Sequence, residues 1–540
     1  MAAILDFSNA LHNGLRPYDI ADRNRMQMRA YQNLRCSEFG ARAHYTIHDP
    51  FAVTPTIAWH HPQILLGKQY ALLMYADSME TIGLNGAEGW TRKAVTTYDW
   101  EDDTKPKNIV AGGTWHMMDF WSTVLLFNGS CIVIKTPANS KWLVITKVTV
   151  KTGCDFRDAR PFMGGFSASD IYSLVSWPTM MQSLHTTAPE EIQTMITAAT
   201  TGADRNWIWF GSPGGGDLFF LFDETFMKYG SREEVPDMGY ADTNPYYMDY
   251  FQRAQMGFLI MPWDGVVKRL KPMGSSVVAY GGIATNGASG GVTACVNYEQ
   301  GVVGLRDFTG MPTTLGIYSA GAVAGDDTGH VFLGDNGELW AVGPNFQAQR
   351  LGYKEFFGPW LEHETYTEVI AVHDPEHQQY YFSDGDMCYV LGKSGLSRAP
   401  WLPLSLAFHQ GGLVGTTIPP EDPNTVILRS DAFDTGDPGT VFMVQGARIR
   451  CKDTEAAQWE LYLEYRASAD SGFERLGPYS PDAAGQVLLK VTGIEFIWEL
   501  RHADASVATL DGIAIEVDGG RTPSLDHRVT KVVEFAEGLA

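Results

Sequence analysis

The stretch VFLGDNGELWAV, residues 331–342, decides the fold class of this 540-residue chain. An apolar triplet comes first, a turn of glycine, aspartate and asparagine follows, and a second apolar run completes the pattern of a β-hairpin. The same pattern recurs in LLFNGSCIVI at 125–134 and in YYFSDGDMCYVL at 380–391. A pattern that repeats along one chain predicts an all-β fold built from repeated units.

Looser copies of the hairpin begin at Leu72, Trp207 and Phe258, so the six starts are 53, 82, 51, 73 and 49 residues apart. Propeller blades repeat at roughly 40 to 50 residues, and longer spacings indicate blades that carry extra loops. We therefore expect a β-propeller of about six blades over residues 51–418. The alternative is another all-β fold with chance hairpins. Pro262 in the fourth hairpin's turn region leaves five or seven blades open.

Helical insertions are predicted at about residues 165–204, in the long spacing between the second and third hairpins, and at about residues 225–255, just before the fourth hairpin. The first contains TAPEE at 187–191, which is typical of a helix start, followed by apolar residues at helical spacing. In the second, four aromatic side chains fall on one helical face: Tyr246, Tyr247, Tyr250 and Phe251. Such a face predicts either packing on the chain's own propeller or docking to a partner, because aromatic residues are enriched at interface centres.

The sequence patterns at the two ends of the chain differ from the hairpin repeats. Residues 1–50 are predicted to form an N-terminal arm with a polar helix around residues 22–31. PPEDP at 419–423 is typical of a linker. Well-alternating strands then predict a small β-sandwich over residues 424–540, with the side chains of one strand buried on one face only: Trp459, Leu461, Leu463 and Tyr465.

Composition narrows the class of partner. Forty basic and 63 acidic residues give a net charge of −23, the wrong sign for tight binding to nucleic acid phosphates. The same sign suits a conduit that must let DNA slide past without sticking. The six cysteines form no C-x-x-C pair, which indicates a reducing compartment and no zinc module. No apolar run is long enough to predict a membrane span.

Three motifs that could carry chemistry have simpler interpretations as turns. GASGG at 287–291 fits the G-x-S-x-G pattern of hydrolases, but a strand pattern follows it where a helix is required. The acid pairs Asp326-Asp327 and Asp384 with Asp386 sit beside glycine, where aspartate is the expected turn residue, although glycoside cleavage also needs paired carboxylates.

Histidine pairs are the remaining candidates for a metal or catalytic site. His60-His61 and the turn HDPEH at 373–377 show neither the H-E-x-x-H spacing nor a cysteine partner. DNGELW at 335–340 resembles an Asp-box turn, which reports a fold and not a catalytic site. We therefore expect no catalytic, cofactor-binding or metal-binding residues, and predict that the chain is not an enzyme.

Several longer runs resemble the propeller segments and terminal β-sandwich of tail hub or nozzle proteins of tailed bacteriophages. The runs are AGGTWHMMDFWSTVLLFNGSCIVIK (111–135), MGFLIMPWDGVVKRLKPMGSSVVAYG (256–281), LGYKEFFGP (351–359), HDPEHQQYYFSDG (373–385) and VLLKVTGIEFIWELRHADASVATLDGIAIEVDGG (487–520). The resemblance covers most of the chain. It rests on the general residue pattern of these runs, and the matching residues include no invariant catalytic motif.

The resemblance implies a structural virion protein, made in the host cytoplasm, that retains and then releases the genome. It implies a closed homo-oligomeric ring, expected to be a hexamer, because identical heterologous contacts must close to avoid an open filament. An adaptor or connector and tail fibre proteins are the implied partners, and DNA is a transient cargo. Two alternatives stay open: a glycan-active or glycan-binding propeller, and a cellular scaffold propeller that binds peptides.

Overall fold

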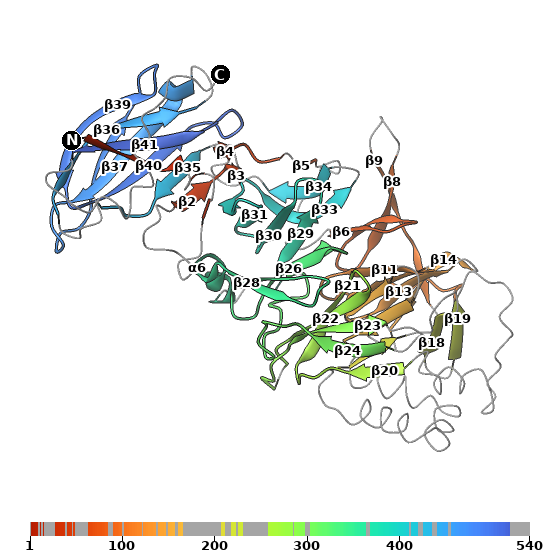
Figure 1. Cartoon of the computed structure of the whole chain (residues 1–540). Helices are drawn as coiled ribbons and strands as arrows, with labels where there is room; N and C mark the ends of the chain where they lie inside the picture. Colours follow the sequence, from red (N-terminus) through yellow and green to blue (C-terminus); the bar gives the residue numbers. More distant parts are fainter. Residues whose placement is uncertain are drawn as a thin grey trace. The chain divides into compact units, whose positions relative to one another are not determined.

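The computed structural model of this chain is all-β and divides into two compact units (Figure 1). Unit 1 consists of Met1–Ile47, Asp374–Pro403 and Thr417–Ala540, and unit 2 consists of His48–His373 and Leu404–Thr416. The structure describes residues 2–8, 11, 14–15, 28–37, 40–45, 47–48, 63–84, 90–99, 102–120, 123–136, 139–146, 150–156, 160–165, 207–210, 218–222, 225–229, 257–284, 286–297, 303–362, 368–409, 412–418, 425–434, 440–451 and 455–518.

Unit 2 is a succession of separate open sheets, most of them four-stranded and antiparallel. The strand orders are β6-β7-β8-β9, β10-β14-β13-β12-β11, β15-β16-β17-β20, β21-β22-β23-β24 and β25-β26-β27-β28. The bounds are β6 Gln63–Leu66, β7 Ala71–Met74, β8 Met79–Leu84, β9 Trp90–Ala94, β10 Thr97–Asp99, β11 His116–Phe120, β12 Thr123–Phe127, β13 Ile132–Thr136, β14 Asn139–Ile145, β15 Thr152–Phe156, β16 Arg160–Gly164, β17 Trp207–Phe210, β20 Gly257–Ile260, β21 Val266–Met273, β22 Ser276–Gly282, β23 Val292–Asn297, β24 Val303–Asp307, β25 Val323–Asp326, β26 Gly329–Leu333, β27 Leu339–Val342 and β28 Ala348–Gly352.

Shorter elements complete this part of the chain. They are the hairpin of β18 (Leu218–Phe222) and β19 (Thr225–Tyr229), helix α6 (Lys354–Phe357), the 3-10 turn η3 (Gly358–Glu362), strand β29 (Ile370–Asp374), and the sheet β33-β34-β5, with β33 at Leu402–His409, β34 at Gly412–Ile418 and β5 at Ile47–His48.

Asparagine and glycine set the turns between neighbouring strands. Between β12 and β13, the side-chain oxygen of Asn128 accepts hydrogen bonds of 2.9 Å from the backbone N–H groups of Ser130 and Cys131. Gly129 adopts a φ of 81° there, and Gly274 adopts 56° between β21 and β22. Glycine is suited to both positions because a side chain disfavours positive φ.

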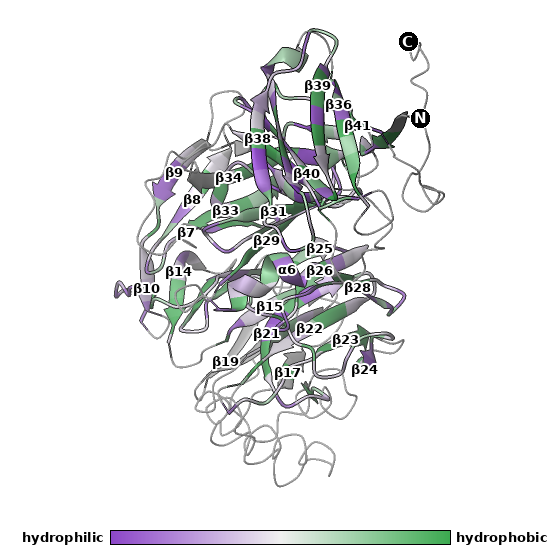
Figure 2. Cartoon of the chain, turned by 90° about the vertical axis from the view of Figure 1, so that its left-hand side faces the viewer, coloured by the Kyte–Doolittle hydropathy of each residue, from purple (hydrophilic) through white to green (hydrophobic). Residues whose placement is uncertain are grey.

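Apolar side chains pack successive sheets of unit 2 face to face. All seven residues of β22 are buried, and Figure 2 shows β22 and β23 largely in the green of hydrophobic residues. Three buried clusters join the first sheet to the second, the third to the fourth, and the fourth to the fifth. A fourth cluster joins the first sheet to Val414 of β34. Strands that are buried on both faces read as continuous apolar runs, as they do here.

Unit 1 contains two sheets that pack against each other. One has the order β1-β41-β36-β39, and the other contains, in order, β30-β31-β32-β2-β35-β40-β37-β38. The rings of Phe442 and Phe496 meet between them, with centroids 4.7 Å apart. The bounds are β1 Ala2–Asp6, β2 Met28–Gln32, β30 Gln379–Ser383, β31 Cys388–Leu391, β32 Leu396–Arg398, β35 Val426–Ser430, β36 Phe442–Arg450, β37 Trp459–Arg466, β38 Glu474–Tyr479, β39 Gln486–Gly493, β40 Glu495–His502 and β41 Gly512–Asp518, with the hairpin β3 (Arg35–Ser37) and β4 (Gly40–Arg42) and the 3-10 turn η4 (Glu455–Gln458) beside them.

Four of the six predicted hairpins are confirmed and two are wrong. The hairpins starting at 72, 125, 331 and 380 form as β7-β8, β12-β13, β26-β27 and β30-β31. In contrast, β17 at Trp207 does not pair with β18, and β20 does not pair with β21. Instead, β17 and β20 pair with each other, from Trp207↔Ile260 to Phe210↔Gly257. The true hairpin partner of β21 is β22, across the turn at Gly274.

The predicted N-terminal arm, residues 1–50, is corrected in its described part. Strand β1 pairs antiparallel with β41 along its whole length, from Ala2↔Asp518 to Asp6↔Ala514. The helix predicted over residues 22–31 is wrong at its C-terminal end, because Met28–Gln32 forms β2 and pairs with β35. Pairing with a distant strand overrides a weak local preference for helix. The alternation predicted from residue 459 is confirmed for Trp459, Leu461 and Leu463, which are fully buried, whereas Tyr465 is only partly buried.

In the part of the chain that the structure describes, no helix has both the length and the apolar character needed to cross a membrane. The helix expected from residue 187 lies outside the described residues.

Candidate functional site

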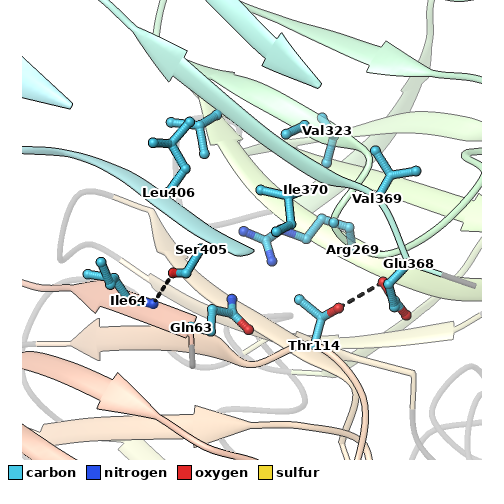
Figure 3. A pocket seen from close by; sticks show the side chains of 13 residues that line it. Gln63, Ile64, Thr114, Arg269, Val323, Glu368, Val369, Ile370, Ser405 and Leu406 are labelled. Carbon is cyan, nitrogen blue, oxygen red and sulfur yellow. Dashed lines mark hydrogen bonds between the residues drawn. The ribbon is translucent and has the colours of Figure 1, made fainter. Parts of the chain in front are cut away.

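A cavity of about 90 Å³ lies in unit 2, where five separate strands and the segments before three strands come together. Figure 3 shows polar side chains along one part of its wall and aliphatic side chains along another. The lining residues are Gln63, Ile64, Thr114, Arg269, Gly321, Val323, Glu368, Val369, Ile370, Ala371, Val372, Ser405 and Leu406. They come from β6, β21, β25, β29 and β33 and from the segments just before β11, β25 and β29.

Arg269 reaches the cavity because of how β21 is held. The register of β21 against β22 shifts between Val267 and Arg269, and the side chains of Val267 and Leu270 are buried in the core between sheets. The backbone N–H of Leu270 donates a 2.9 Å hydrogen bond to the hydroxyl of Thr152 on β15. This bond fixes the strand beside Arg269, and Figure 3 shows the guanidinium extending among the other lining residues.

The guanidinium of Arg269 has a neutral partner. Its Nη1 donates to the ring of His116 on β11, at 3.2 Å from Nε2 and closer to Nδ1. Burial and then the charge of Arg269 hold the pKa of His116 well below its usual range, so the ring is uncharged. The Nε atom of Arg269 is buried and has no hydrogen-bond partner. His116 therefore accepts from Arg269 without neutralising it.

Glu368 is the carboxylate that lines the cavity, and its hydrogen bonds go elsewhere. Its Oε2 accepts a 2.8 Å hydrogen bond from the hydroxyl of Thr114. The hydroxyl of Ser319 and the backbone N–H of Gly321 also donate to this carboxylate. Burial raises the pKa of Glu368 despite these bonds. No ion pair joins Arg269 to Glu368 or to another described residue, so Glu368 does not neutralise the guanidinium by direct contact.

Two lysines on the same strand, Lys268 and Lys271, add positive charge near Arg269. Burial, then the charge of Arg269, lowers the pKa of Lys271 to about 8. Burial also lowers the pKa of Lys268, whose ammonium donates a 2.8 Å hydrogen bond to the backbone carbonyl of Tyr318. Burial lowers the pKa of Arg269 to about 10, so the guanidinium stays charged at neutral pH. The strand thus carries three cations, with Glu368 and Asp335 acting on Lys268, Glu368 on Arg269 and Asp326 on Lys271.

The acid pairs are in turns, as predicted. Asp326 accepts hydrogen bonds from the backbone N–H and hydroxyl of Thr328, at 2.8 and 2.6 Å. Asp384 accepts from the backbone N–H groups of Asp386 and Met387, at 3.0 and 2.9 Å. These bonds engage one oxygen of each carboxylate, as turn aspartates do, while the other oxygen of Asp384 is buried without a hydrogen-bond partner. Ser289 lies in a loop that β23 follows directly, so the context of a nucleophile elbow is absent there.

The histidines of the 373–377 turn pair with carboxylates. His373 lies 3.4 Å from Asp326, and His377 lies 2.7 Å from Asp374. No group of three or more potential metal ligands occurs among the described residues. His60 and His61 lie outside the described residues, as do the predicted docking residues Tyr246, Tyr247, Tyr250 and Phe251.

Sequence reasoning missed the cavity residues. The available signal was KRLK at 268–271, three cations within a stretch otherwise rich in apolar residues. Charged residues inside a buried strand are rare unless they are paired or functional. Their convergence with Thr114, Glu368 and Ser405 depends on contacts between distant segments, which a local pattern does not contain.

Comparisons with known proteins assign no family. No protein-family model matches the sequence, and no curated protein matches it. Among solved structures, the crystal structure of human WBSCR16 is similar over 77% of this chain and 96% of that chain, with 11% sequence identity and a TM-score of 0.29. A TM-score this low does not establish a shared fold.

Proposed function

We propose that unit 2 is a β-propeller whose sheets surround the cavity. Consecutive four-stranded antiparallel sheets, each joined to the next in chain order, are what propeller blades consist of. Strand β15 is packed beside both β11 and β21. The backbone N–H of Ile64 on β6 donates a 2.8 Å hydrogen bond to the hydroxyl of Ser405 on β33, so early and late segments of the unit meet. This meeting supports a ring of sheets.

We propose further that the chain is a structural component of a bacteriophage tail, a hub or nozzle subunit that forms a closed homo-oligomeric ring around the DNA channel. The observation that carries this proposal is the repeated sheet of unit 2, a rigid scaffold whose buried clusters run from one sheet to the next. The sequence resemblance and the net charge of −23 support it, because an acidic conduit repels DNA.

The glycan alternative is not favoured by the cavity. Pockets that bind ligands of drug or sugar size usually have volumes of roughly 300 to 1,000 Å³. The cavity in unit 2 measures about 90 Å³, and among the described residues a single carboxylate, Glu368, lines it. Glycoside cleavage needs two carboxylates at controlled separation.

Imaging of the purified full chain tests the proposal. We expect cryo-electron microscopy at micromolar concentration to show closed rings, and analytical ultracentrifugation to give a mass close to that of a hexamer. Immunogold labelling with an antibody to the chain should mark the tails of virions that encode it. A strictly monomeric chain that leaves such virions unlabelled contradicts the proposal.

A further inference from the structure

We propose that the cavity of unit 2 binds a small carboxylate with a short hydrocarbon chain, whose carboxylate is held by the guanidinium of Arg269. This inference does not depend on the role in a phage tail. It rests on the donors that the cavity leaves unused, the character of its walls and its volume.

The hydrogen bonds of Arg269 indicate that the ligand carries a carboxylate. A guanidinium carries five N–H donors in a planar fork that matches the two oxygens of a carboxylate. Among the described residues, the Arg269 guanidinium donates hydrogen bonds only to the ring of His116, and its buried Nε has no partner. Arg269 is partly buried, and although the charge of Glu368 acts on it, no carboxylate contacts the guanidinium directly, so an anion that enters the cavity is favoured.

The one carboxylate in the wall does not substitute for such an anion. Glu368 already accepts hydrogen bonds from the hydroxyls of Thr114 and Ser319 and the backbone of Gly321. Its oxygens are thus oriented by neutral donors and make no direct pair with Arg269. Ser405 adds a further donor, because its oxygen accepts from the backbone of Ile64 while its proton has no acceptor among the described residues.

The walls distinguish a carboxylate from an inorganic oxyanion. Figure 3 shows aliphatic side chains across the cavity from the polar group, and the lining includes Val323, Ile370 and Leu406. Phosphate or sulfate would turn desolvated oxygens toward these side chains, and an unsatisfied buried oxygen is costly. A hydrocarbon tail placed there loses only its contact with water, which is favourable.

The volume limits the length of that tail. About 10 to 15 Å³ of cavity is enough for one water molecule. The 90 Å³ observed therefore holds about six non-hydrogen atoms, the size of butyrate, and excludes a sugar ring or a nucleotide.

Titration calorimetry with a homologous series tests the site. Acetate, propionate, butyrate and octanoate are added as sodium salts to the full-length chain, with sodium chloride as the blank and inorganic phosphate as the competing anion. We expect affinity to rise about fourfold with each methylene from acetate to butyrate. Octanoate should bind more weakly than butyrate because it exceeds the cavity.

Two matched variants locate the binding. Arg269→Gln should weaken butyrate binding at least tenfold, because the charged fork is lost. Arg306→Gln makes the same change at an exposed arginine that stacks on Phe346, 4.1 Å from its ring centroid, and should leave affinity unchanged. If Arg269→Gln does not fold, saturation-transfer NMR on the wild-type chain gives the second measurement. It should show the butyrate methyl protons receiving more magnetisation than the methylene protons next to the carboxylate.

Several outcomes overturn the proposal. Binding that is equal in the wild type and Arg269→Gln places the anion elsewhere. Phosphate binding that depends on Arg269, without a rise along the carboxylate series, makes this an inorganic anion site. Heat changes no larger than those of sodium chloride mean that water alone fills the cavity. None of these results bears on ring formation, which is measured separately.

Discussion

Arginines on the sheet of unit 1 and Arg269 in unit 2 occupy opposite electrostatic situations. In unit 1, Glu499 on β40 lies 2.6 Å from the Arg475 guanidinium, 2.7 Å from that of Arg501 and 3.0 Å from that of Arg429. Glu464 on β37 lies 2.5 Å from Arg429 as well. In unit 2, Arg269 meets only the uncharged ring of His116.

The difference separates a structural network from a binding site. Charges that pair and hydrogen-bond with one another do not require a ligand for neutralisation. Removing one member of such a network leaves the others uncompensated. A buried charge with a neutral partner is a cost to the fold that a ligand can offset. The two regions should therefore respond with opposite signs when a charge is removed.

Glu499→Gln should produce the largest effect. The side chain of Glu499 is only 5% exposed and accepts from three guanidinium groups. Its replacement by a neutral amide should cost about 3 kcal/mol of unfolding free energy, because three arginines lose their shared counter-charge. Urea unfolding followed by circular dichroism measures the loss. Glu474→Gln, at an exposed carboxylate on the edge strand β38 of the same sheet, is the matched control and should leave the midpoint unchanged.

Arg269→Met should have the opposite sign. Removing a partly buried charge that no carboxylate contacts directly should raise the unfolding free energy by about 1 kcal/mol in buffer free of organic anions. The same urea experiment measures it. A loss of stability as large as that of Glu499→Gln would show that Arg269 is satisfied within the fold, and the contrast between the two regions would fail.

The pH dependence of unit 2 should also differ from that of unit 1. Burial and the charge of Arg269 lower the pKa of Lys271 from 10.5 to about 8. Between these two values the unfolded chain binds more protons than the folded one, so stability rises with pH. From pH 8 to 9, this titration should add about 1 kcal/mol to the stability of the wild type relative to a variant without Lys271.

Lys271→Met should abolish this rise, as measured by thermal unfolding across the pH series. For Glu499, burial alone would raise the pKa, but hydrogen bonds from Arg501, Arg475 and Arg429 lower it overall. Its stabilising contribution is present above the pKa of the unfolded chain and is lost as the pH falls through the folded pKa. A Lys271→Met variant with the same slope as the wild type would exclude the assigned titration.

The smallest effect tests the edge of the unit 1 network. The ring of Tyr462 lies 4.3 Å from the Arg475 guanidinium carbon and 5.1 Å from that of Arg501. Tyr462→Leu should cost about 0.5 kcal/mol, the size of an exposed cation–π contact. Tyr462→Phe keeps the ring and should match the wild type in the same urea titration. Equal losses in both variants would assign the effect to the hydroxyl.

The sequence predicted local features of the fold well, and for a physical reason. Strand alternation at Trp459 and the turn at Asn128-Gly129 are decided by neighbours in the chain. The hairpins proposed at Trp207 and Phe258 failed because β17 and β20 join across 46 intervening residues, from 211 to 256, and nearby apolar runs offered false partners. The site depends on the same kind of distant contact, so the local cluster of cations at 268–271 did not reveal which residues Arg269 would meet.

The pairing of β1 with β41 has a consequence for synthesis. Unit 1 takes strands from both ends of the chain, from Ala2–Asp6 and Gly512–Asp518. The first of these leaves the ribosome long before its partner exists, while all of unit 2 is made in between. Contacts between segments so far apart form slowly, and unpaired strands invite association with other chains. Unit 2 is therefore expected to fold during translation, and unit 1 to close only after the last strand emerges.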